Sequence, residues 1–83
     1  MTLQGTRVTS GKLRDFFNTP GAYGLVGGHW LAMVPSGDLG NLDNHTITEH
    51  EDGTITVAPS ILVSDNHGQR WHGYLEHGVW REV

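Results

Sequence analysis

The chain has 83 residues, of which 36% are hydrophobic, and its nine acidic and five basic residues give a net charge of −4. A chain of this length buries only about 60% of its unfolded surface, so we expect one small domain over residues 1–83, with little stability to spare for a strained catalytic cleft. The absence of cysteine excludes disulfides, cysteine-bound zinc and thiol nucleophiles, and the scattered basic residues argue against a nucleic-acid partner.

The N-terminal residues and the apolar runs bear on localisation. The first seven residues lack the apolar core of a signal peptide, and no apolar run approaches the ~18 residues of a membrane span. We therefore expect a cytoplasmic protein that does not enter a membrane.

Residues 10–18 form the one helical candidate in the chain. Ser10 is a suitable N-cap, and Leu13, Phe16 and Phe17 have the spacing of one helix face. Thr19, Pro20 and Gly21 follow and end the segment. A helix of barely two turns is stable only when its apolar face packs on something larger, which we expect to be a sheet.

Two hairpins are predicted in the first two thirds of the chain. Residues 22–26 and 30–34 are apolar runs separated by Gly27-Gly28-His29, and residues 35–44 then read as a long loop whose leucines fold back on the core. Residues 45–50 and 54–58 flank Glu51-Asp52-Gly53, a three-residue loop with glycine at the bulge position. That loop sets Thr48 opposite Thr56 and Ile47 opposite Val57, so that like residues pair on each face.

The C-terminal third adds a further hairpin. Pro59 is expected to end the preceding ladder, and residues 64–68 are expected to turn. Residues 70–75 and 79–83 then pair around Glu76-His77-Gly78, through a loop of either two or three residues that places Trp80 opposite Leu75 or Tyr74. The fold class is therefore mainly β (small α+β): an antiparallel β-meander of short strands with one N-terminal helix.

From Pro20 onward, the order of features resembles a family of small uncharacterised phage and bacterial proteins, some of which carry the label ammonia monooxygenase. The matching segments are Pro20-Gly21, Trp30 with residues 34–38, residues 52–61, residues 72–75 and residues 78–80, which together span about three quarters of the chain.

In many members of this family the segment matching residues 34–38 reads Cys-Pro-x-Gly-Cys, and another cysteine precedes the histidine that matches His72. This chain has Val34 and Asp38 where the first two cysteines would be. The resemblance therefore implies the family fold without its zinc ligands. It also implies a phage or prophage origin and no established activity.

Six histidines invite a metal hypothesis, but their spacing does not support one. Ligands on one strand stand two residues apart, whereas His45 and His50, His67 and His72, and His72 and His77 are each five apart. We expect no cofactor and no metal. The alternative reading is a structural or hydrolytic metal-binding domain built on His72 with Asp38 and other histidines.

Catalytic arrangements are weak in this sequence. Glu49, Glu51 and Asp52 are clustered carboxylates, but a hairpin tip offers no apolar wall to separate their pKa values, so we interpret them as a solvated turn. Ser60 lies in Pro-Ser-Ile, which is not a nucleophile elbow. We expect no enzymatic activity.

The sequence favours a non-enzymatic protein-binding module of phage or prophage type, active in the cytoplasm of a bacterial host as an inhibitor of a defence or metabolic protein. Its acidic balance would steer it toward a host protein with a basic surface. Trp30 and Trp80 are assigned to the core, and Trp71 and Tyr74 to the surface. The residues predicted to contact the partner are Asp38, Asp43, Glu49, Glu51, Asp52, Trp71 and Tyr74.

Overall fold

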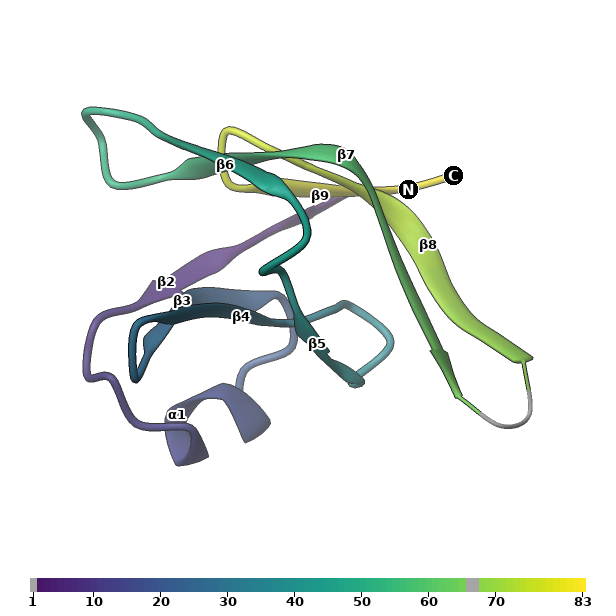
Figure 1. Ribbon diagram of the computed structural model, residues 1–83, viewed down its shortest axis with the longest axis horizontal. Helices are drawn as coiled ribbons and strands as arrows, with labels where there is room; N and C mark the ends of the chain where they lie inside the picture. The colour runs from purple at the N-terminus through teal and green to yellow at the C-terminus, as the bar shows by residue number, and fades with distance from the viewer. Residues whose placement is uncertain (1, 66–67) are drawn as a thin grey trace.

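The computed structural model describes residues 2–65 and 68–83, and its regular structure consists mainly of β-strands (Figure 1). Its elements within that range are β1 (Thr2–Gln4), β2 (Thr6–Val8), α1 (Arg14–Phe17), β3 (Ala22–Val26), β4 (His29–Met33), β5 (Leu39–Asn41), β6 (Thr46–Glu49), β7 (Ile55–Asp65), β8 (Gly68–Glu76) and β9 (Val79–Glu82). The predicted mainly β class is confirmed.

The strands form two sheets. A five-stranded sheet has the order β1-β9-β8-β7-β6, and a four-stranded sheet has the order β2-β3-β4-β5. Neighbouring strands are antiparallel except for β2 and β3, which run parallel. The chain passes from one sheet to the other at Gly5, whose N–H donates to the carbonyl of Gly78 at 2.7 Å, and again between β5 and β6.

The first two strands were not predicted. Both β1 and β2 have only three residues, and most of their side chains are exposed. They carry no strong alternation of apolar and polar residues, so their conformation depends on pairing with β9 and β3. Strands specified by distant partners leave little local signal.

The helix is shorter than expected. Gly11 has a φ of 72°, a left-handed conformation that cannot belong to a helix, so the predicted N-cap at Ser10 is wrong. The helix has four residues, of which Phe16 is buried and Phe17 is 59% exposed. In the part of the chain that the structure describes, no helix is long and apolar enough to cross a membrane.

The hairpin register predicted for residues 45–58 is confirmed. Thr48 pairs with Thr56 and Ile47 with Val57, and the His50 N–H donates to the Thr54 carbonyl at 2.9 Å to close the loop. Gly53 occupies the bulge with a φ of 87°. The loop type and the alternation of threonine with apolar residues therefore specified this register together.

The other two predicted hairpins also form, each through a two-residue turn. Val26 pairs with His29 around Gly27-Gly28. Glu76 pairs with Val79, which resolves the open alternative and places Trp80 opposite Leu75.

Of two expectations about the middle of the chain, one was wrong and one is confirmed. The long loop contains β5, which pairs with β4, and only Leu42 of its two leucines is fully buried. The expectation for Pro59 is confirmed: the pairing of β6 with β7 stops at Ala58, immediately before the proline, which has no N–H to donate. The strand β7 itself continues to Asp65 through its pairing with β8. In the turn predicted at residues 64–68, Asp65 pairs with Gly68, and residues 66 and 67 lie outside the described residues.

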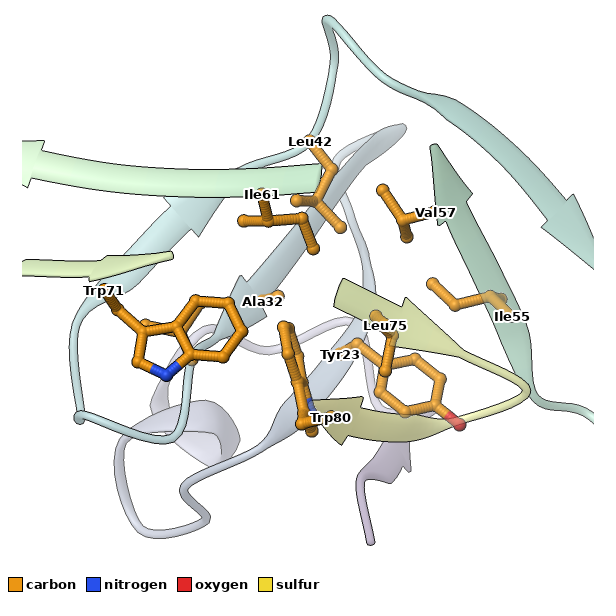
Figure 2. Close-up of a cluster of buried hydrophobic side chains, with 10 residues drawn as sticks. Tyr23, Ala32, Leu42, Ile55, Val57, Ile61, Trp71, Leu75 and Trp80 are labelled. Carbon is orange, nitrogen blue, oxygen red and sulfur yellow. The ribbon is translucent and has the colours of Figure 1, made fainter. Parts of the chain in front are cut away.

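The main core lies between the two sheets (Figure 2). Its buried members are Tyr23, Ala32, Val34, Leu42, Ile55, Val57, Ile61, Trp71, Leu75 and Trp80. The Trp80 indole N–H donates to the carbonyl of Gly21 at 2.7 Å. The Trp71 ring packs edge-on against the Trp80 ring, with 5.4 Å between the two ring centres. Phe16 forms a smaller cluster with Ala22 and Met33 under α1.

The aromatic assignments were partly right. Trp80 is buried as predicted, whereas Trp30 is only partly buried at the margin of the core. The predicted exposure of Trp71 was wrong, because only 4% of this residue is accessible.

Candidate functional site

The end of the β6–β7 hairpin carries three carboxylates, which we call the acidic tip: Glu49 at the end of β6, and Glu51 and Asp52 in the loop. All three residues are exposed. The Gly53 N–H donates to the carbonyl of His50 at 3.0 Å, so the loop is a closed turn with a defined shape. The acidic tip therefore presents its charges from a fixed backbone, at the end of the β6–β7 hairpin (Figure 1).

Asp52 is the most firmly held member of the acidic tip. Its Oδ1 accepts hydrogen bonds from the Thr54 hydroxyl at 2.6 Å and from the Thr54 N–H at 3.0 Å. These two bonds lower the pKa of Asp52, the hydroxyl bond contributing most. The carboxylate therefore stays charged at pH values where a free aspartate begins to be protonated.

Glu49 is tied to the other sheet. Arg7 of β2 donates to Glu49 Oε1 at 3.3 Å and to the Gly53 carbonyl at 3.1 Å, and its guanidinium lies 5.0 Å from the centre of the Trp30 ring. These contacts offset part of the charge of Glu49 and orient the hairpin. Among the described residues, Glu51 makes no hydrogen bond or ion pair, so its carboxylate is fully available to a partner.

Two histidines lie beside the acidic tip, a feature that sequence reasoning missed. The His50 and His77 rings stack at 3.8 Å, and Thr56 Oγ1 lies 2.6 Å from His50 Nε2 and accepts the His77 N–H at 3.0 Å. This contact joins the β6–β7 turn to the β8–β9 turn. The two residues stand 27 positions apart in the chain, so no local spacing could reveal their contact.

Asp38 and Asp43 lie outside the acidic tip, near the two ends of β5. Asp38 Oδ2 accepts the Ser36 hydroxyl at 2.7 Å, and Asp43 Oδ2 lies 2.7 Å from His29 Nδ1. Figure 1 shows the β6–β7 turn well separated from β5. The predicted acidic stretch is therefore divided between two places on the surface.

Trp71 and Tyr74 do not share a face. On β8, residues 71, 73 and 75 are buried, whereas residues 72, 74 and 76 face outward. Strand side chains alternate with a period of two, so positions three apart point to opposite sides. Trp71 therefore belongs to the core and does not present its ring to a partner, while the Tyr74 ring lies outside under the Arg81 guanidinium at 4.6 Å.

The residues of the metal hypothesis are engaged elsewhere. His72 Nε2 lies 2.9 Å from Ser60 Oγ, and His45 Nε2 donates to the Ser60 carbonyl at 3.1 Å. No three histidine, aspartate or glutamate side chains converge as metal ligands within residues 2–65 and 68–83. His67, another histidine of that hypothesis, lies outside this range.

Ser60 and His72 form a hydroxyl–imidazole contact without the rest of a catalytic triad. A nucleophilic serine needs a base that is oriented by a third group and donors for the developing oxyanion. Within the described chain, Ser60 Oγ is the hydrogen-bond partner of the His72 ring, and no carboxylate orients that ring. The contact is consistent with a structural hydrogen bond.

Comparison of this chain with protein-family models, curated proteins and solved structures found no match. The family resemblance proposed from residues 20–80 therefore remains a prediction.

Proposed function

We propose that this protein is a non-enzymatic binding module that attaches to a host protein through the acidic tip. The single observation behind the proposal is an exposed cluster of carboxylates on a closed turn, in which Glu51 has no partner within the described chain. The closed turn limits the backbone freedom that is lost on binding, and the carboxylates steer association with a surface of opposite sign.

The partner we propose has a basic surface. The chain carries a net charge of −4, and the two hydrogen bonds from Thr54 lower the pKa of Asp52. Basic surfaces are common where host proteins hold nucleic acid, so an acidic hairpin could occupy such a surface and block it. In keeping with the resemblance to phage and bacterial proteins, we propose that the protein acts in the cytoplasm of a bacterial host, against a defence or metabolic protein.

The experiment is affinity capture from host lysate with three forms of the immobilised protein. The first is the wild type, and the second reverses the tip through Glu51→Lys and Asp52→Lys. The third is a matched control, Asp15→Lys with Glu82→Lys, which changes the net charge equally at exposed positions on α1 and β9. Circular dichroism should show that all three forms fold.

The expected result is a specific protein that is retained by the wild type and the control and lost with the tip variant. Recovery of no specific protein contradicts the proposal. So does a captured protein that the tip variant retains as well as the wild type, because binding would then not involve the acidic tip.

A further inference from the structure

A hollow of about 250 Å³ opens between β5 and the distal half of β7, away from the acidic tip. Its wall consists of Leu39, Gly40, Asn41, His45, Ile61, Leu62 and Val63. The two strands belong to different sheets, and Figure 1 shows the second half of β7 running past β5 toward the end of the β7–β8 hairpin. The hollow is therefore bordered by one strand from each sheet.

The outer edge of β5 presents unpaired backbone groups. β5 lies at the end of its sheet, with β4 as its neighbour. The Val34 N–H donates to the Asp38 carbonyl and the Leu42 N–H to the Trp30 carbonyl, and both bonds fit the register of the β4–β5 pair. Backbone groups alternate along a strand, so Gly40 faces β4, while the N–H and C=O groups of Leu39 and Asn41 point away from it.

The distal part of β7 has an unpaired edge as well. The pairing with β6 stops at Ala58, whereas the pairing with β8 continues along the strand. The Val83 N–H donates to the His72 carbonyl, so the backbone groups of His72 point toward β9. Leu62 is the residue of β7 that lies opposite His72, in a pair without mutual hydrogen bonds. The backbone groups of Leu62 therefore point away from β8. The neighbouring Ser60 carbonyl already accepts the His45 ring N–H, and this histidine stands where the strand pairing ends.

We propose that this hollow binds an extended peptide segment of a partner protein, which pairs with the outer edge of β5 and lies against the unpaired edge of β7. Alternating donors and acceptors are complementary to another extended backbone. The exposed side chains of Leu39, at 37%, and Leu62, at 55%, offer apolar contacts beside that backbone. Acidic Asp38 and Asp43 stand near the two ends of β5, so a segment with flanking lysine or arginine residues is the best match in charge.

This second surface is separate from the acidic tip and can be tested without a known partner. The probe is a displayed library of random 12-residue peptides, selected on the immobilised wild-type protein. We expect the selected peptides to have apolar residues at alternate positions and to carry lysine or arginine. When a synthetic copy of a selected peptide is bound, amide hydrogen exchange of the protein should slow at Leu39, Asn41 and Leu62 and remain unchanged at the acidic tip.

Methylation of single backbone nitrogens in the selected peptide tests the pairing while leaving the protein intact. Strand addition predicts that methylation at alternate positions weakens binding about tenfold or more, while methylation at the intervening positions has little effect. A protein variant, Leu39→Pro, removes one outward N–H and should weaken binding about as much. The matched control is Gln4→Pro, at an exposed position on the edge strand β1.

Several results would overturn the proposal. They are the absence of any enriched peptide, a methylation profile without alternation, and slowed exchange confined to residues outside the hollow. Self-association of the wild type in analytical ultracentrifugation, with the same amides protected, would assign the hollow to a second copy of the chain. If Leu39→Pro fails to fold, the methylation profile alone decides the outcome.

Discussion

The shape of the acidic tip can be tested at Gly53, whose φ of 87° lies in the left-handed region. A Cβ added at this position would have no heavy atom within 4 Å, so a side chain there meets no obstruction. Substitution therefore changes the free energy of unfolding only through the backbone conformation. A residue with a Cβ pays about 1–2 kcal/mol in this region, and β-branched residues fall at the upper end, whereas asparagine tolerates it.

We predict that Gly53→Val lowers the free energy of unfolding by about 1–2 kcal/mol, Gly53→Ala by about 1 kcal/mol and Gly53→Asn by less. For a domain of this length, a loss of 1 kcal/mol lowers Tm by about 4–8 °C. Urea denaturation followed by tryptophan fluorescence provides the comparison. Equal midpoints for Gly53→Val and wild type would refute the left-handed loop, and a loss above about 3 kcal/mol would refute its open surroundings.

Three further outcomes are expected. Trp80→Phe should lower the free energy of unfolding by about 2–4 kcal/mol, because it removes the buried bond to Gly21 and leaves a cavity; a change below about 1 kcal/mol in urea denaturation would argue against that packing. Because the pKa of Asp52 is lowered on folding, its charged form stabilises the fold at pH values above the ordinary pKa of 3.8, and this stabilisation is lost as the pH falls through the folded pKa. Asp52→Asn should therefore weaken the loss of stability that the wild type shows in acid. An unchanged loss of stability in acid would contradict the role of Thr54. EDTA should leave Tm unchanged, and a fall of several degrees that zinc restores would revive the metal hypothesis.

The hairpins were predictable because their signals are local. Gly53 in a three-residue loop, flanked by alternating threonine and apolar residues, specifies both the turn and the register of β6 and β7. The alternation of side chains between the two faces of a strand could also have placed Trp71 in the core. Leu75 lies four positions further along the same strand, so it shares a face with Trp71, and it is buried.

The rest of the fold depends on contacts between distant residues. The strands β1 and β2 acquire their conformation by pairing with β9 and β3, respectively. The predicted start of the helix at Ser10 was wrong because Gly11 adopts a left-handed conformation. The division of the acidic residues follows from β5, a strand whose three residues carry no strong strand signal of their own. The histidine stack and the hollow likewise bring together elements that are far apart in sequence.

The most direct test of the binding function is the association rate of the captured host protein with the three charge variants. At about 50 mM salt, the Glu51→Lys and Asp52→Lys double variant should associate about tenfold more slowly than the Asp15→Lys and Glu82→Lys control, although the two have the same net charge. The difference should shrink at about 200 mM salt as screening increases. Equal association rates for the two variants at low salt would contradict a contact through the acidic tip.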